Sequence, residues 1–320
     1  MKILFVTNMY PTRDHPASGT FVMHQAEQLK RLGHEVDIFH ILGYRSKFNY
    51  LKAMFQIFVR TLIKNYDIAH AHYGLSGFSA LFRWRTPLVI TLHGSDALVG
   101  KIQPFISKFA CRFADAVIAV SKKIASVIPG EVIPCGVDLS VFKPYGRSSA
   151  REKLGLPMNK HLILFPFDPL KRMKRYDLAK EVIEELCVSG HDVELLVVSN
   201  VKNEEMPFYY SAADAMILCS DSEGSPTSVK EALACNVPVV STNVGDIEEI
   251  MDGIPGTRIC DQNIRNLASC LEEILNKKSN DFEARPYMQR YSQVRLVKSI
   301  IKVYEKIFRE KDQRSGLTVM

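Results

Sequence analysis

The feature that most constrains the fold is a repeated alternation of short strand-like runs with longer amphipathic stretches. In the first half of the chain the strand-like runs are Lys2–Thr7, Glu35–His40, Ile68–His72, Leu88–Leu92, Ala116–Val120 and Glu131–Pro134. Amphipathic stretches such as Thr20–Leu32 and Lys101–Phe113 lie between them. Leu88–Leu92 is apolar on both faces, which is typical of a central strand in a parallel sheet. The pattern predicts a doubly wound α/β sheet.

The alternation is interrupted once and then starts again. Residues 136–155 contain Pro144, Gly146 and two adjacent serines, a composition typical of a linker. The strands expected beyond it are His161–Phe165, Val193–Ser199, Ala215–Cys219, Val237–Ser241 and Thr257–Cys260, and the helices are Arg175–Ser189, Pro226–Cys235 and Ile264–Asn276. We therefore predict one Rossmann-like domain over residues 1–145 and a second over 146–292, facing a cleft. An amphipathic helix and tail over 293–320 should pack back toward the first domain.

Composition limits the class of protein further. The chain has 320 residues, of which 47% are hydrophobic, so it can bury two cores. It has no apolar run near the ~18 residues of a membrane span, and its start turns polar too soon for a secretory signal. We expect a cytoplasmic protein whose seven cysteines are reduced thiols and bind no metal. The net charge is +8 over residues 1–145 and −2 over the rest, which indicates different partners for the two halves.

The most informative stretch is Glu-Gly-Ser-Pro-Thr-Ser-Val-Lys-Glu at residues 223–231. Pro226 is favoured in the first turn of a helix, and Ser225 is a good N-cap before it. Such a helix would begin at the carboxyl end of the strand Ala215–Cys219, where its free amides can bind phosphate. Glu223 before the helix and Glu231 inside it can accept hydrogen bonds from sugar hydroxyls. The stretch predicts a sugar-nucleotide site, with the diphosphate near Gly224, Ser225, Pro226 and Thr227.

Several other function classes lack their signatures. The chain has no Gly-x-Gly-x-x-Gly after a strand, which argues against a dinucleotide dehydrogenase. It has no P-loop sequence and no Gly-x-Ser-x-Gly nucleophile elbow. Its basic residues accompany no nucleic-acid-binding module, so we expect no nucleic acid partner.

The whole set of motifs resembles the retaining family 4 glycosyltransferases, which have the GT-B fold. The resemblance rests on Glu223-x7-Glu231 with its continuation Ala-Leu-Ala-Cys-Asn-Val-Pro-Val-Val, and on Asp67-Ile-Ala-His-Ala-His, Thr91-Leu-His-Gly-Ser-Asp and Val132-Ile-Pro-Cys-Gly-Val-Asp. It covers most of the chain. The segment Glu-Gly-Ser-Pro…Val-Lys-Glu is similar to the corresponding segment in the teichuronic-acid-type branch of that family.

The resemblance implies roles for individual residues. Glu223 would contact the donor sugar, Glu231 the nucleotide ribose, and Lys174 the donor diphosphate. His93 would lie near the reacting sugar, and Gly19 would allow the backbone of the first loop to approach the donor phosphate or the acceptor closely. The family usually has an arginine six residues before the lysine; Asp168 stands there in this chain, and Arg172 is the candidate substitute. The implied catalytic group is His93, Lys174 and Glu223, with no metal and no cofactor beyond the donor, a UDP-sugar being favoured over a GDP-sugar.

The implied reaction is transfer of a sugar with retention of configuration to a saccharide or lipid-linked acceptor in cell-surface polysaccharide synthesis. Two alternatives stay open: a GT-B sugar-nucleotide epimerase, and a non-catalytic subunit that only binds sugar nucleotides. An enzyme that consumes donor without acceptor would favour the first alternative, and absence of donor hydrolysis would favour the second.

Residues 44–66 form a separate feature. They contain five Lys or Arg, no acidic residue, and interleaved aromatics. The segment fits a basic amphipathic helix on an anionic membrane, which would suit a lipid-linked acceptor on the inner face of the plasma membrane. It fits equally a core helix with a solvated basic face.

Overall fold

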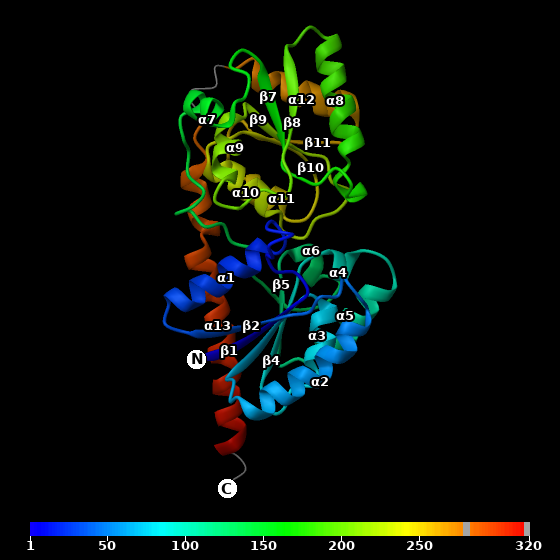
Figure 1. Ribbon diagram of the computed structural model, residues 1–320, viewed down its shortest axis with the longest axis vertical. Helices are drawn as coiled ribbons and strands as arrows, with labels where there is room; N and C mark the ends of the chain where they lie inside the picture. The colour runs from blue at the N-terminus through cyan, green and yellow to red at the C-terminus, as the bar shows by residue number, and fades with distance from the viewer. Residues whose placement is uncertain (278–281, 317–320) are drawn as a thin grey trace. The chain divides into compact units, whose positions relative to one another are not determined.

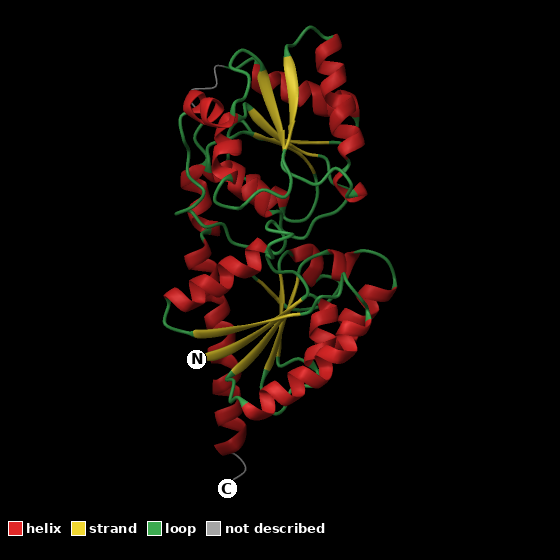
Figure 2. Cartoon of the chain, in the orientation of Figure 1, coloured by secondary structure: helices red, strands yellow, loops and turns green. Residues whose placement is uncertain are grey.

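The computed structural model describes residues 1–277 and 282–316 and divides into two compact units. Unit 1 comprises Met1–Pro11, Ser18–Cys135 and the C-terminal helix from Gln293 onward. Unit 2 comprises Thr12–Ala17 and Gly136–Ser292. The division therefore falls at Cys135, earlier in the chain than the boundary expected at residue 145. Figure 2 shows strands bracketed by helices in each unit, and the predicted fold class of two parallel-sheet α/β domains is confirmed.

The sheet of unit 1 has six parallel strands in the order β2-β1-β3-β4-β5-β6. Their bounds are β1 Lys2–Thr7, β2 Glu35–His40, β3 Ile68–His72, β4 Leu88–Leu92, β5 Ala116–Ala119 and β6 Glu131–Val132. The first four begin and end where the hydrophobic runs predict. The helices are α1 Thr20–Arg31, α2 Phe48–Ile63, α3 Gly74–Ala80, α4 Ser95–Leu98, α5 Ile102–Arg112, α6 Lys122–Ala125 and α13 Gln293–Gly316.

Two hydrophobic clusters pack against the two faces of this sheet. On one face, Leu4, Ala69 and Ile90 of the strands meet Ala53 and Ile57 of α2. On the opposite face, neighbouring strand residues pack against α1 and α13. Successive residues of a strand point to opposite faces, so a continuous apolar run supplies both clusters. Figure 1 shows α2, α3 and α5 side by side on one face of the sheet, and α1 with α13 on the other.

The sheet of unit 2 has five parallel strands in the order β11-β10-β9-β7-β8. Their bounds are β7 His161–Phe165, β8 Val193–Val197, β9 Ala215–Leu218, β10 Val239–Thr242 and β11 Arg258–Cys260. The helices are α7 Arg147–Leu154, η1 Arg172–Lys174, α8 Tyr176–Val188, α9 Met206–Ala212, α10 Thr227–Ala234, α11 Ile247–Met251, α12 Ile264–Leu275 and η3 Arg285–Tyr291. Helices α8 and α12 cover one face, and α9 and α10 cover the other.

The expectation of a linker over residues 136–155 is wrong for its second half, where α7 forms. Arg151 of this helix is buried, and its guanidinium donates to Asp214 Oδ2 at 2.7 Å and to the carbonyl of Ala212 at 2.9 Å. Gly155 ends the helix in the left-handed conformation, with φ 64°. The two adjacent serines that indicated a linker therefore lie on a helix held by a buried arginine.

Within the described ranges, every helix is too short or too polar to cross a bilayer.

Candidate functional site

Two of the predicted site residues meet in unit 2, although 49 positions separate them in the sequence. Lys174 Nζ donates to Glu223 Oε1 at 2.5 Å, and the two side chains are 20% and 14% exposed. The ammonium also lies 4.2 Å from the centre of the Phe167 ring. The amide of Asp221 donates to the carbonyl of Met173 at 3.0 Å, which ties the loop after β9 to the η1 turn. A cation and a carboxylate are therefore held together beside the carboxyl ends of β7 and β9.

The other charged residues of the η1 turn have different surroundings. Arg172 is exposed at the start of η1. Asp168, which replaces the arginine expected from the resemblance, accepts from the amide of Leu170 at 3.0 Å and closes a turn. Arg175 was not predicted; it has φ 55° and its guanidinium bonds both Asp177 and Asp221. Arg175 thus fixes the turn that presents Lys174.

Helix α10 begins one residue later than predicted. Pro226 is its N-cap, with φ −66° and ψ 109°, and Thr227 is the first helical residue. The prediction that Ser225 caps the helix is wrong, because its hydroxyl donates instead to Asp246 Oδ2 at 2.7 Å. Among the described residues no side chain caps the first turn. The leading amides of α10 are consequently left for water or an anion.

The loop that carries Gly224 and Ser225 is held from behind by groups that the sequence pattern does not reveal. Lys230 is fully buried; its Nζ donates to Ser225 Oγ and lies 3.5 Å from Asp246 Oδ2. Gly245 has φ 64°, and a Cβ there would lie 2.8 Å from the carbonyl oxygen of Gly224. Only glycine permits both this conformation and this approach. The Gly224–Pro226 loop is therefore positioned by a buried ion pair and a glycine.

Glu231 lies on α10 and faces α9. Its Oε2 accepts from the hydroxyl of Tyr210 at 2.8 Å. Burial raises the pKa of Glu231 from 4.5 to about 7, and hydrogen bonds from Tyr210 and Thr227 oppose that rise. Glu231 therefore stands near its protonation midpoint at neutral pH. Tyr210 was not predicted, because its place in the sequence is 21 residues away from Glu231.

Gly19 lies in unit 1, where it is the N-cap of α1. Its φ of 65° is in the left-handed region. A Cβ at this position would lie 2.4 Å from the carbonyl oxygen of Met9. The structure thus requires glycine here because the loop between β1 and α1 packs closely on itself at Met9. Close approach of this loop to the donor phosphate or the acceptor stays a prediction.

His93 also lies in unit 1, at the end of β4. Its Nε2 is 3.1 Å from His72 Nδ1, and its Nδ1 is 3.8 Å from the Cys135 sulfur. The rings of Phe21 and Tyr73 each lie 4.7 Å from the His93 ring, centre to centre. Burial lowers the pKa of His93 to about 3, so the imidazole is neutral at physiological pH. The neutral ring has one N–H donor and one acceptor nitrogen, and it brings no charge.

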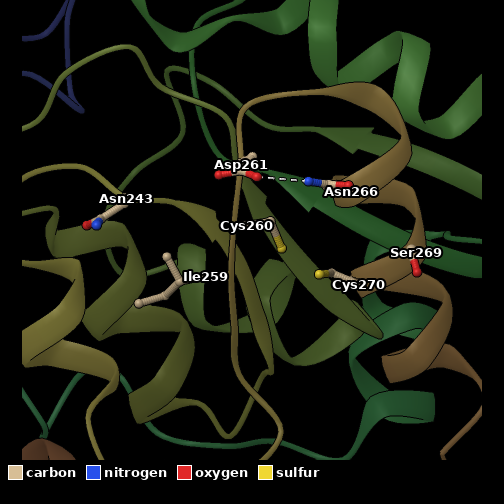
Figure 3. A pocket seen from close by; sticks show the side chains of 7 residues that line it. All are labelled: Asn243, Ile259, Cys260, Asp261, Asn266, Ser269 and Cys270. Atoms are coloured by element: carbon tan, nitrogen blue, oxygen red, sulfur yellow. Dashed lines mark hydrogen bonds between the residues drawn. The ribbon is translucent and has the colours of Figure 1, made fainter.

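Unit 2 also contains a pocket of about 380 Å³ at the ends of β10 and β11 and the start of α12 (Figure 3). Its lining is Asn243, Ile259, Cys260, Asp261, Asn266, Ser269 and Cys270. None of the predicted donor-site residues is among them. The candidate site is thus defined by the Lys174–Glu223 contact and the start of α10 rather than by this pocket.

Comparison with known families shows that this two-domain chain is a glycosyltransferase. The family model described as Glycosyltransferase Family 4 matches residues 18–141, and that described as Glycosyl transferases group 1 matches residues 174–277. The second match includes Lys174, Glu223 and Glu231. The chain belongs to these glycosyltransferase families, with one matched domain in each unit.

Two relatives indicate its place among them. The chain is 28% identical to the Bacillus subtilis protein assigned to teichuronic acid biosynthesis as glycosyltransferase TuaC, over 78% of this chain and 83% of that one. It is 26% identical to the D-inositol 3-phosphate glycosyltransferase of Mycolicibacterium smegmatis, over 67% of this chain. It spans only 60% of the length of that second relative.

Solved structures share the fold at low sequence identity. Sucrose-phosphate synthase from Thermosynechococcus elongatus is 19% identical, with a TM-score of 0.79 over 97% of this chain and 99% of that one. The Anabaena protein HepE, solved in complex with UDP-glucose, is 19% identical, with a TM-score of 0.72 over 96% of this chain and 100% of that one.

Proposed function

We propose that the protein transfers a sugar from a nucleoside diphosphate sugar to a saccharide or lipid-linked acceptor, with retention of configuration, in cell-surface polysaccharide synthesis. The observation that carries the proposal is the contact of Lys174 with Glu223 next to the uncapped start of α10. An ammonium and free helix amides bind diphosphate, while a carboxylate beside them binds sugar hydroxyls. The UDP-glucose bound by HepE supports a UDP-sugar over a GDP-sugar, and the TuaC relative supports the polysaccharide role.

In this proposal the protein stabilises a departing diphosphate. Negative charge grows on that group as the glycosidic bond breaks, so Lys174 and the α10 amides stabilise the transition state more than the ground state. Arg172, exposed on the same turn, supplies a second cation. The acceptor hydroxyl attacks from the face that the diphosphate leaves, and the diphosphate takes the acceptor proton. The enzyme then needs no nucleophile of its own and no metal ion.

The remaining predicted residues orient the donor. Glu231 accepts hydrogen bonds from the ribose diol in its ionised form, which its pKa of about 7 makes available at neutral pH. We assign His93 a hydrogen bond to the donor sugar, for which its neutral ring is suited. Gly19 fixes the turn that enters α1.

The test compares Lys174→Ala and Glu223→Ala with Lys171→Ala, an exposed lysine in the same segment that serves as the matched control. UDP- and GDP-sugars are screened for transfer or hydrolysis. We expect the first two variants to lose at least about a hundredfold in turnover, because each removes a contact to the reacting donor. The control should keep wild-type turnover, and all three should keep the wild-type melting temperature within a few degrees.

Wild-type turnover in purified Lys174→Ala or Glu223→Ala would refute the assignment. Donor consumption that needs no acceptor and yields an epimer would replace transfer by epimerisation. Proton NMR of the product determines the stereochemistry. An inverted anomeric centre would contradict retention but would leave the rest of the proposal standing.

We also propose that the protein works at the cytoplasmic face of the plasma membrane as a peripheral protein. Of the two interpretations of residues 44–66, the surroundings of α2 favour membrane contact. Ile57 is the one large apolar residue that the helix buries fully, beside Ala53 and Thr61. Its other large apolar residues are half-buried or exposed, and the exposed ones are Phe48, Leu51, Phe55, Phe58, Leu62 and Ile63. A core helix would bury the large residues and expose the small ones. Binding to anionic vesicles at low salt is the measurement, and failure to bind them would remove this part of the proposal.

A further inference from the structure

Helix α5 repeats the unusual arrangement of α2. It buries Ser107 and Ala110 and exposes larger apolar side chains. Ile102 is 75% exposed and Phe105 is 72% exposed, and Phe109 and Phe113 are also exposed. A helix that meets only water places such side chains inward. Both helices therefore present to the outside the residues that a soluble helix buries.

The two helices and the turn that follows α3 form one face. Helix α3 packs against both α2 and α5. Phe82 and Trp84, in the turn after α3, are exposed, and the Trp84 ring meets the Phe58 ring of α2 edge-on with centres 5.8 Å apart. Figure 1 shows α2, α3 and α5 adjacent on the same side of the unit 1 sheet. We call the outer surface of α2, the turn at residues 82–85 and α5 the aromatic face.

The charges of the aromatic face are all of one sign. Residues 44–66, 81–87 and 97–114 contain no acidic residue. Its exposed basic residues are Arg45, Lys47, Lys52, Arg85, Lys101, Lys108 and Arg112, whereas Lys64 at its edge pairs with Asp37. A second copy of the chain docked on this face would bring positive charge against positive charge, which opposes association. An anionic bilayer offers both the negative charge and the apolar depth that the face matches.

We propose that the whole aromatic face, α5 and the Trp84 turn included, lies on the headgroup region of an anionic bilayer. Phe48, Phe55, Ile102 and Phe105 enter the boundary between headgroups and acyl chains, and the lysines and arginines around them contact lipid phosphates. The inference rests on the proposed membrane contact of residues 44–66. It adds α5 and the Trp84 turn to the surface that contacts lipid. Contact through two helices and a turn fixes the orientation of unit 1 on the membrane, which a single helix would leave free to rotate about its axis.

Trp84 makes the first experiment direct, because it is the single tryptophan of the chain. The wild-type protein is mixed with phosphatidylserine-containing vesicles with and without brominated acyl chains. We expect a blue shift of the emission and at least about twofold quenching by the brominated lipid, with little change on pure phosphatidylcholine. Vesicle binding in sedimentation without quenching of Trp84 would overturn the inference and leave the contact of α2 standing.

The second experiment separates α5 from α2. The double variant Ile102→Ser/Phe105→Ser is compared with Phe48→Ser/Phe55→Ser and with the control Val188→Ser, an apolar residue 86% exposed in unit 2. Both double variants should partition onto phosphatidylserine vesicles at least about tenfold more weakly, and the control should equal the wild type. The melting temperature and its increase on adding UDP should be unchanged in all, since exposed side chains leave no cavity when shortened.

Three other outcomes would contradict the inference, and they differ in what else they contradict. If only the α2 variant loses binding, α5 does not bear on lipid and the inference fails, whereas the proposed peripheral location survives. If the wild type binds no vesicle, both fail. If sedimentation velocity shows a dimer that both double variants dissociate, the aromatic face is a protein interface and the inference is overturned.

Discussion

At the scale of single residues, Glu231 is the site carboxylate whose acidity the fold alters. Its folded pKa is about 7 against an ordinary 4.5, because burial disfavours the charged form. A carboxyl whose pKa is raised on folding contributes stability below its ordinary pKa, and that contribution is lost as the pH rises through the folded value. The ligand-free protein should thus lose on the order of 2 to 3 kcal/mol from this group between about pH 4.5 and about pH 7.

Glu231→Gln removes this titration while keeping an acceptor for the Tyr210 hydroxyl. Urea unfolding of both proteins from about pH 5 to about pH 8 measures the effect. We expect the stability of the wild type to fall relative to the variant over this range. A difference between the two proteins that does not change with pH would mean that Glu231 keeps an ordinary pKa.

The buried Lys230–Asp246 pair predicts strong coupling between two substitutions. Lys230→Met leaves the Asp246 carboxylate, whose pKa burial already raises, without its nearest cation. Breaking such a pair by removing one partner costs about 3 to 5 kcal/mol. The double variant Lys230→Met/Asp246→Asn should cost less than Lys230→Met alone, because no buried charge is left over.

A double-mutant cycle by urea unfolding measures that coupling, and UDP titration of the same variants measures its effect on the site. Lys230→Met should weaken UDP binding, because the Gly224–Pro226 loop loses the contact of Lys230 with Ser225. Additive losses of stability, or unchanged UDP affinity, would show that the pair does not hold this loop.

At the scale of elements, the ends of β3 and β4 carry three stacked histidines. His70, His72 and His93 are all held neutral: burial lowers the pKa of His70 and of His93 to about 3, and that of His72 well below 6.5. His70 also bonds Tyr304 of α13 and Thr91 of β4, at 2.6 and 2.7 Å. The cluster therefore joins the central strands of unit 1 to its C-terminal helix.

This cluster predicts that unit 1 is labile to acid. A histidine whose pKa is lowered on folding contributes stability above its ordinary pKa, and the contribution is lost as the pH falls from about 6.5 through about 3. Trp84 lies in unit 1, so its emission reports the unfolding of that unit. We expect unit 1 to unfold within this window. In His93→Gln the number of protons taken up on unfolding should fall by about one; an unchanged proton uptake would contradict the low pKa.

The regular elements were largely predictable, because strand runs and helix periods are local patterns. Strands β1 to β4 and β7 agree with their predicted bounds. Helix α7 was not predicted, because what holds it is Arg151 bonding Asp214, 63 residues away. Residues 44–66 fit either a membrane-surface helix or a core helix from the sequence, because periodicity alone does not say which side of a helix meets the sheet.

At the scale of the whole molecule, the sequence motifs name residues that the fold brings together, but they do not name the residues that support them. The Lys174–Glu223 contact joins two predicted residues. The supporting residues belong to no motif in the sequence, and only the fold brings them to the site. Tyr210 contacts Glu231, Asp246 contacts Ser225, and Gly245 lies against Gly224. The error at Ser225 has the same origin, because a buried aspartate 21 positions away competes for its hydroxyl. The division of charge, +8 in residues 1–145 and −2 beyond, matches the separation of the aromatic face in unit 1 from the proposed diphosphate site in unit 2.

The most direct test of the account is a crystal structure of the protein soaked with UDP. The account predicts the diphosphate at the first-turn amides of α10, with Lys174 Nζ turned from Glu223 onto a phosphate oxygen. UDP bound elsewhere, with the Lys174–Glu223 contact intact and the start of α10 unoccupied, would contradict it.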